Sequence, residues 1–329
     1  MLIARHFAFR LLISFTGVCC IVQSQANDWS YYGADQGGTR YSALTQINRD
    51  NVDELEEVWS YQTGEVERRG VDKITAAKTQ NNPVIVDEQL ILCTPFNRII
   101  SVDPASGKEN WFFEPDINLD TEQNFNCRGV VIWVDESINE DDQCYKRLLF
   151  GTNDARLFAI DAANGERCNG FGEKGEVVVL PDAAKNYPGG VQFVSPPVVL
   201  NDVAVIGSVI LDRIRVDSPS GQVRAYNAKT GEPLWNFDPI PRDDTDSAAA
   251  TWINGGNHTT GSANVWSPMV VDEARDMVFM ATSSPAPDLY GGNRHGDNRY
   301  ADSLVALRGQ TGEVIWHYQL VHHNLWDYD

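Results

Sequence analysis

The residues best suited to chemistry stand at the end of the sequence, in His322-His323-Asn324-Leu325-Trp326-Asp327-Tyr328-Asp329. This segment combines two histidines, two aromatic side chains and two carboxylates. A carboxylate beside a large ring can bind a metal ion or act as a general base. The same composition suits a polar loop that packs through its rings, and composition alone does not decide between these interpretations.

Other motifs of catalytic or nucleotide-binding sites have little support. Gly170-Phe171-Gly172-Glu173-Lys174-Gly175 matches the GxGxxG pattern. A dinucleotide site needs a helix after that loop, whereas residues 176–180 have the pattern of a strand. We therefore favour a glycine-rich turn. The sequence contains no HExxH, GxSxG or P-loop motif, which leaves hydrolase and nucleotide-binding functions without support.

A unit that repeats along the sequence is expected to position the residues of the segment at 322–329. It consists of a strand, a turn that contains glycine, and a second strand that opens with a large residue, and it occurs four times. The turn glycines lie 58, 66 and 81 residues apart in the sequence, and they are Gly107, Gly165, Gly231 and Gly312. A four-stranded propeller blade needs about 40–50 residues, and inserted loops lengthen it. We predict an all-β protein with a β-propeller fold; a β-sandwich is the alternative.

Three of the units place a tryptophan after the turn, at Trp111, Trp235 and Trp316. Each indole is expected to cover apolar surface of the neighbouring unit. Helical patterning is scarce, and only residues 51–59 predict a helix, with Asn51 as its cap. Four units leave exposed sheet edges, so we expect the chain to provide only part of a closed ring.

The N-terminus has the pattern of a secretory signal. Arg5 and Arg10 precede an apolar stretch over residues 11–22, and small residues stand before a cleavage point after Ala26. The apolar stretch is shorter than the roughly 20 residues of a membrane span, although a membrane anchor is the alternative. We predict a signal peptide at 1–26, a partial propeller domain at 27–329, periplasmic localisation and no transmembrane segment in the mature chain.

The net charge indicates which partners are unsuitable, and the cysteines indicate which disulfides could form. The formal charge of −20 becomes −22 without the signal, which disfavours nucleic acid as a partner. Cys93, Cys127, Cys144 and Cys168 would remain in the exported chain and permit two disulfides. We favour a bond between Cys127 and Cys144, because they flank two apolar runs that could form a hairpin; free buried thiols are the alternative.

The segment at 322–329 resembles the active-site segment of quinoprotein dehydrogenases, in the membrane-type glucose and quinate dehydrogenase branch. Further stretches match that family in order, at residues 29–33, 37–42, 93–98, 126–130, 195–197, 285–288 and 291–294. The resemblance covers essentially all of 27–329. It implies an eight-bladed propeller when complete, with about half of the ring present here.

The resemblance also implies pyrroloquinoline quinone (PQQ) as the cofactor, together with Ca²⁺ or Mg²⁺. By similarity, Asp327 is the base that takes the substrate hydroxyl proton and lies close to the metal. Asp212 falls near the metal-binding acid of the family, in a segment one residue longer than expected. Trp266 matches the indole on which the quinone stacks.

Four more residues are implied in cofactor binding. Arg128 and Arg224 match arginines that could pair with the quinone carboxylates, or form structural ion pairs instead. Asn124 stands where the sugar branch tends to place a histidine, and Gln80 where some members have glutamate. Ser284 replaces a metal-binding asparagine of the alcohol branch. These departures leave the substrate more open than the cofactor.

The family resemblance predicts oxidation of a sugar or cyclic polyol by hydride transfer to PQQ. Electrons would pass to a quinone or a periplasmic carrier. One alternative is a quinoprotein alcohol dehydrogenase, although the vicinal disulfide of those enzymes has a counterpart only in Cys19-Cys20, within the predicted signal. Another is a non-catalytic envelope scaffold, which shares the repeat but needs neither Asp327 nor Trp266.

Overall fold

The computed structural model describes residues 29–119, 124–179, 189–213 and 215–328. The predicted signal peptide at 1–26 lies outside these ranges. Within them, no helix is long and apolar enough to cross a membrane.

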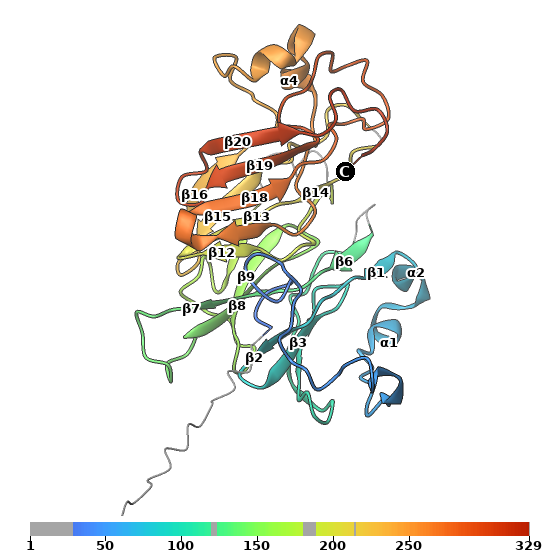
Figure 1. Cartoon of the computed structure of the whole chain (residues 1–329), viewed down its shortest axis with the longest axis vertical. Coiled ribbons are helices and arrows are strands. Elements are labelled where there is room, and N and C mark those ends of the chain that lie inside the picture. Colours follow the sequence, from blue (N-terminus) through green and yellow to red (C-terminus); the bar gives the residue numbers. More distant parts are fainter. Residues whose placement is uncertain (1–28, 120–123, 180–188, 214, 329) are drawn as a thin grey trace, which may run out of the picture.

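Four antiparallel sheets of four strands dominate the structure, as the propeller prediction requires (Figure 1). We call them blades 1 to 4 in chain order. Blade 1 contains β2 (Val84–Val86), β3 (Gln89–Cys93), β4 (Ile99–Val102) and β5 (Glu109–Phe113). Blade 2 contains β7 (Val131–Val134), β8 (Lys146–Gly151), β9 (Arg156–Asp161) and β10 (Glu176–Val178). Blade 3 contains β12 (Val198–Leu200), β13 (Val203–Ile206), β15 (Val223–Asn227) and β16 (Pro233–Phe237). Blade 4 contains β17 (Val270–Asp272), β18 (Met277–Ala281), β19 (Ser303–Arg308) and β20 (Val314–Gln319).

The first strand of each blade is the innermost one. Strand β12 contacts both β7 and β17, so these first strands face one another while the last strands lie outside. Two short strand pairs lie outside the four blades. These pairs are β1 (Ala77–Thr79) with β6 (Phe125–Cys127), and β11 (Val191–Gln192) with β14 (Val209–Ile210).

Helices are few and short. The α-helical turns are α1 (Glu65–Arg69), α2 (Val71–Ile74) and α4 (Gly256–Thr259). The 3-10 turns are η1 (Val52–Glu54), η2 (Ala249–Thr251), η3 (Ile253–Gly255) and η4 (Glu273–Arg275). The helix predicted over 51–59 is wrong, because only η1 forms there. The Asn51 side chain accepts a hydrogen bond from the Asn48 backbone instead of capping a helix, and Trp59 packs on blade 1.

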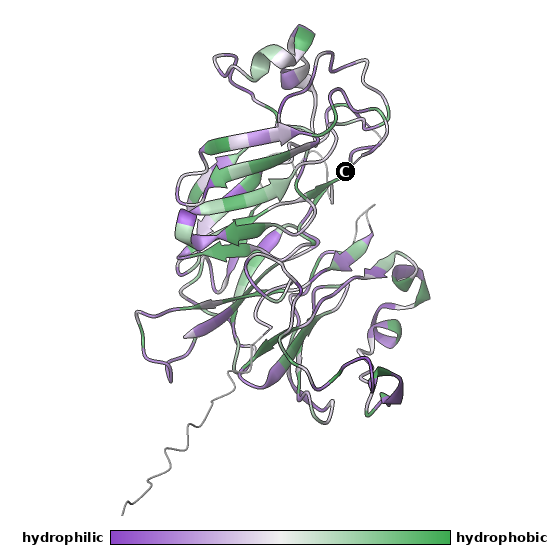
Figure 2. Cartoon of the chain, in the orientation of Figure 1, coloured by the Kyte–Doolittle hydropathy of each residue, from purple (hydrophilic) through white to green (hydrophobic). Residues whose placement is uncertain are grey.

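Apolar side chains fill the spaces between neighbouring blades, and Figure 2 shows the strands as largely hydrophobic. Leu148 and Leu149 of β8 are both fully buried, but on opposite faces. Leu148 joins the cluster shared with blade 1, and Leu149 the cluster shared with blade 3. Because side chains alternate along a strand, each blade supplies two cores at once. Truncation of either leucine to alanine would cost about 2–5 kcal/mol.

Two of the turn glycines lie beneath the indole of the preceding unit, which confirms the predicted role of Trp111 and Trp235. Gly165 and Gly312 have positive φ angles, and a Cβ at either would lie within 2.6 Å of the rings of Trp111 and Trp235, respectively. Any other residue would therefore meet both backbone strain and a clash. Trp59 covers Gly107 in the same way, although it precedes blade 1.

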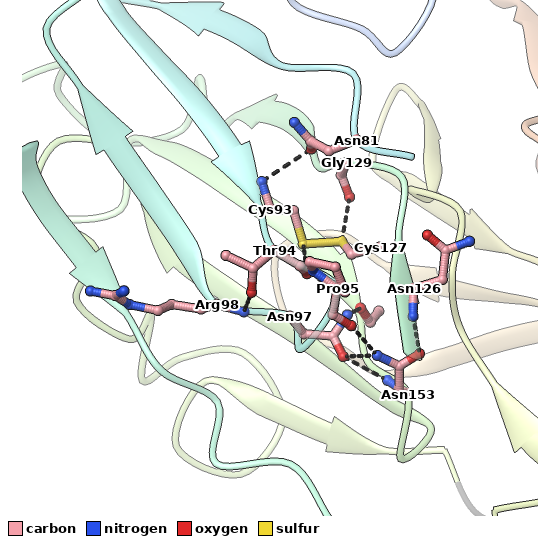
Figure 3. Close-up of a disulfide and its surroundings, with 11 residues drawn as sticks. Asn81, Cys93, Thr94, Pro95, Asn97, Arg98, Asn126, Cys127, Gly129 and Asn153 are labelled. Atoms are coloured by element: carbon pink, nitrogen blue, oxygen red, sulfur yellow. Dashed lines mark hydrogen bonds between the residues drawn. A yellow bond between two sulfur atoms is a disulfide. The ribbon is translucent and has the colours of Figure 1, made fainter. Parts of the chain in front are cut away.

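The two disulfides join Cys93 to Cys127 and Cys144 to Cys168. The predicted Cys127–Cys144 bond is wrong. The β7–β8 hairpin does form, but its register places Cys127 beyond the open end and Cys144 near the turn. Cys127 instead meets the end of β3 in the adjacent blade, as Figure 3 shows.

Candidate active site

A cavity of about 430 Å³ lies where the chain enters the inner strands of the four blades. Gln80, Arg128, Val194 and Trp266 line it, and each stands three or four residues before an inner strand. We call the short stretches that carry them the entering segments. Because the same part of every blade contributes, the propeller repeat itself brings distant residues to one place.

Hydrogen bonds between the entering segments fix their relative positions. The Asn82 backbone N–H donates to the Arg128 carbonyl at 2.9 Å, and the Arg128 N–H donates to the Val194 carbonyl at 2.7 Å. The Arg128 side chain extends this network to blade 4, where its Nη1 donates to the Trp266 carbonyl at 2.9 Å. Ser195 Oγ accepts from the same Nη1 at 3.1 Å.

Arg128 and Trp266 also stack. The guanidinium carbon lies 4.9 Å from the indole centroid, which is within cation–π range. Burial lowers the pKa of Arg128, yet an arginine keeps its charge across the ordinary pH range. The pair therefore presents a fixed positive charge beside a flat apolar ring.

The β1–β6 pair forms one wall of the cavity and carries Gln80 and Asn124 beside it. Gln80 Oε1 accepts from Asn126 Nδ2 at 2.6 Å. With its amide oriented to satisfy both neighbours, Asn124 accepts from Lys78 Nζ at 3.2 Å. Lys78 also lines the cavity and was not identified from the sequence. The rim on this side is thus a polar surface with one exposed cation.

Of the two predicted metal acids, Asp212 lines the cavity and Asp327 lies outside its lining. Asp212 and Arg213 both line the cavity. Arg213 Nη2 lies 3.2 Å from Asp327 Oδ2, and its Nε lies 3.7 Å from Asp288 Oδ2. Asp327 is therefore linked to the cavity through an ion pair with one of its lining residues. Arg213 was not identified from the sequence, because the ion pair joins residues 114 positions apart.

A buried polar network supports the loop that carries Asp327. Asn324 is fully buried, and its Nδ2 donates to Ser284 Oγ at 2.6 Å and to Asp302 Oδ1 at 2.7 Å. Arg294, also fully buried, donates from Nη2 to the Asn324 carbonyl at 2.5 Å. Ser284, expected beside a metal, thus contacts Asn324. Buried polar groups bonded in this way hold a loop in one conformation.

Arg224, another predicted site residue, does not line the cavity. It lies in β15, and its guanidinium donates to the carbonyl and to Oε1 of Gln222, both at 3.1 Å. Burial lowers its pKa. Its geometry is that of a structural arginine, so its role toward a cofactor stays a prediction without geometric support.

The cavity fits an anionic, planar group. Among the described residues that line it, Lys78, Arg128 and Arg213 are basic, whereas Asp212 is the only acid. This excess of positive charge stands out in a chain of net charge −20. Carboxylates of a ligand would find three cations, and its ring would find the indole of Trp266.

A metal fits less well. In the parts of the chain that the structure describes, no group of three or more His, Cys, Asp or Glu side chains could hold a metal ion. Asp212 and Asp327 alone do not complete the six to eight oxygen ligands that Ca²⁺ takes. These residues therefore do not form a calcium site by themselves.

Comparisons with known proteins identify relatives of the whole described region. The family model for the glucose/ethanol/alcohol dehydrogenase β-propeller domain with PQQ matches residues 29–329. The chain is 36% identical to quinoprotein glucose dehydrogenase of Escherichia coli (strain K12), over 92% of this chain and 38% of that protein. It is 33% identical to quinate/shikimate dehydrogenase (quinone) of Acinetobacter baylyi, over 92% and 38% of the respective chains.

Solved structures agree with this fold. The structure of quinohemoprotein alcohol dehydrogenase from Comamonas testosteroni superposes with a TM-score of 0.73 at 27% identity, over 92% of this chain and 42% of that one. The chain spans about 40% of the length of the curated relatives that it matches.

Proposed function

The chain belongs to the PQQ β-propeller family of glucose, ethanol and alcohol dehydrogenases, and on this premise we propose that it takes part in PQQ-dependent oxidation of a sugar or cyclic polyol. The observation that carries the proposal is the stacked pair of Arg128 and Trp266 in a cavity with three cations. Its relatives include a glucose and a quinate/shikimate dehydrogenase, which supports the substrate class.

When bound, PQQ would supply the acceptor for the hydride from the substrate carbon. Trp266 would support the ring of the quinone. Arg128, Lys78 and Arg213 would face its carboxylates, because arginine and lysine bind such groups through charge-assisted hydrogen bonds. Asp327 is the residue that we propose to take the proton of the substrate hydroxyl at its carboxylate oxygen.

Calcium dependence is part of the proposal but rests on the family resemblance. Asp212 and Asp327 are the candidate ligands in this chain, with Mg²⁺ as the alternative ion. Removal of divalent cations by a chelator, followed by measurement of activity on return of Ca²⁺ or Mg²⁺, would identify the ion.

We also propose export to the periplasm and transfer of electrons to a quinone or a periplasmic carrier. The signal pattern over residues 1–26 supports export. The similarity to a quinate/shikimate dehydrogenase (quinone) supports a quinone as the electron acceptor. N-terminal sequencing of the protein from the periplasmic fraction should find a chain that begins after Ala26. An uncleaved chain in the cytoplasmic fraction would contradict the proposal.

The enzyme proposal is tested by reconstitution of the full-length protein with PQQ and Ca²⁺. Dye reduction is then measured with glucose, quinate and ethanol. Reduction with glucose or quinate would support the sugar or polyol branch. A preference for ethanol would favour the second candidate function, that of an alcohol dehydrogenase. The observation that supports this candidate is the similarity to the alcohol dehydrogenase structure from Comamonas testosteroni. Bound PQQ without reduction by any alcohol would favour a non-catalytic propeller scaffold.

A further inference from the structure

Residues 29–40, which we call the axial segment, run against the innermost strands instead of joining a blade. The Trp29 carbonyl accepts a hydrogen bond from the N–H of Ile85 in β2, at 2.9 Å. The Gln36 carbonyl accepts from the N–H of Val271 in β17, at 3.0 Å. The axial segment therefore covers the free inner edges of blades 1 and 4, and it lies near the centre of the view in Figure 1.

The axial segment also faces blades 2 and 3. A small cavity of about 190 Å³ separates it from residues 130–131, 196–198 and 268–271. These residues follow Arg128, Val194 and Trp266 in the same entering segments. The axial segment thus lies one layer further along the propeller axis than the residues that line the large cavity. Its Tyr31 packs against the apolar cluster that blades 2 and 3 share, so the segment contacts all four blades.

A tight turn gives the axial segment its shape. The Arg40 N–H donates to the Gly33 carbonyl at 2.8 Å, and a Cβ at Gly33 would lie 2.5 Å from the Gly38 Cα. Gly38 has a φ of +68°, and a Cβ there would lie 3.1 Å from Val270 Cγ1 of β17. The turn is therefore fitted closely to blade 4.

Asn82 connects the axial segment to the large cavity. Its side-chain Nδ2 donates to the Tyr32 carbonyl, while its backbone N–H donates to the Arg128 carbonyl. Gly129, next to Arg128, is so close that a Cβ would lie 3.2 Å from the Asn82 carbonyl and 3.9 Å from the Tyr32 ring. A continuous path of contacts leads from Tyr32 through Asn82 to Arg128 and on to Trp266.

We propose that the axial segment supports the floor of the cofactor cavity from the next layer, and that Asn82 is a positioning residue that fixes Arg128 and Trp266 where the cofactor binds. The inference rests on the proposed PQQ function. Asn82 does not line the cavity, so it acts only through Arg128. A support that is tied to all four blades would also close the cavity on the side of the axial segment, and so keep water from reaching the ring from that side.

The test measures PQQ binding to the full-length apoprotein by quenching of tryptophan fluorescence, alongside thermal unfolding of the same apoprotein. Asn82→Ala removes the donor to Tyr32, and Asn82→Asp keeps the size but replaces that donor by an acceptor. We expect both variants to raise the Kd for PQQ at least about tenfold, the change that about 1.4 kcal/mol produces. Asn110→Ala is the control, because Asn110 also donates one side-chain hydrogen bond in blade 1, to Ser101, away from the cavity.

Gly38→Ala perturbs the axial segment from the side of blade 4 without touching Asn82, and it serves if the Asn82 variants fail to fold. A raised Kd in every folded variant of Asn82 and in folded Gly38→Ala, with Asn110→Ala unchanged, supports the inference. A Kd within twofold of the wild type in any folded variant of Asn82 or in Gly38→Ala would overturn it and leave the PQQ proposal standing. Failure of the wild-type protein to bind PQQ would overturn both.

Discussion

The carboxylate of Asp327 is paired with Arg213 in the structure, and this pair locates the proposed base at the edge of the cavity. We predict that Asp327→Asn lowers kcat by about 10²–10⁴-fold, the usual contribution of a general base, and largely spares PQQ binding. Dye reduction and a PQQ titration on the full-length protein would check this. Asp297→Asn, at an exposed aspartate nearby, is the control and should keep its activity. Undiminished turnover in Asp327→Asn would remove Asp327 as the base.

Two arginines with similar burial separate a cofactor role from a structural one. Arg128→Gln should raise the Kd for PQQ roughly 10–100-fold, because a hydrogen bond to a charged group contributes about 1.5–3 kcal/mol. Arg224→Gln should leave that Kd unchanged, since Arg224 bonds only within its own strand region and does not line the cavity. Equal losses at both positions would show that the cofactor lies closer to β15 than the cavity suggests.

At the scale of elements, the two disulfides form a matched pair for experiment. They close loops of similar length, with sequence separations of 34 and 24, so loss of either should reduce the unfolding free energy by about 3–4 kcal/mol. Only Cys93–Cys127 adjoins Arg128. We therefore predict that Cys93→Ser with Cys127→Ser weakens PQQ binding, whereas Cys144→Ser with Cys168→Ser lowers stability alone. Thermal unfolding and PQQ titration of both variants would show the difference.

His317 in strand β20 makes the free energy of unfolding depend on pH. Burial, followed by the charge of Arg299, lowers the pKa of His317, whose Nε2 accepts from Arg299 Nε at 3.1 Å. The unfolded chain, with a histidine pKa near 6.5, then binds the proton more readily than the folded chain. The contribution of His317 to stability is present above that pH and lost as the pH falls below it. His317→Gln should therefore show a smaller drop in unfolding free energy between pH 7.5 and 5.5, measured by urea titration; an equal drop would contradict this assignment.

Local sequence was a good guide to the strands and turns. The glycines predicted to form turns do adopt positive φ angles, which a residue without Cβ adopts without strain. The disulfide pairing was not accessible in the same way, because Cys93 and Cys127 meet only when blade 2 is placed beside blade 1. The failed helix at 51–59 has a similar cause, as Trp59 gains more from packing on Gly107 than an isolated helical turn provides.

The residues of the candidate site also fall into two groups, those that the sequence indicates and those that only the fold reveals. Family resemblance pointed to Gln80, Asn124, Arg128, Asp212 and Trp266, and the fold brings them to one cavity. The resemblance did not indicate Arg213 or Asn82, whose importance comes from contacts across blades. Arg224 matched a pattern in sequence but faces elsewhere in three dimensions. Spacing along the chain identifies candidates, and the relative placement of blades decides which of them can act together.

At the scale of the whole molecule, the chain spans about 40% of the length of its relatives. We predict that residues 27–329 alone bind PQQ at least about 100-fold more weakly than the full-length protein, because the walls that surround a cofactor on one side supply only part of its contacts. Fluorescence titration of both forms would measure the ratio. Equal affinity would show that these four blades suffice for binding.

The equivalent placement of Gln80, Arg128, Val194 and Trp266, each just ahead of an inner strand, has an evolutionary consequence. If such a propeller grew by duplication of one ancestral unit, every new copy brought another position already directed at the shared ligand. Mutations at these positions could change the chemistry of the site while the apolar clusters between neighbouring blades stayed intact. A laboratory library that aims to change which cofactor the cavity accepts would then best begin with these four codons, leaving the scaffold unaltered.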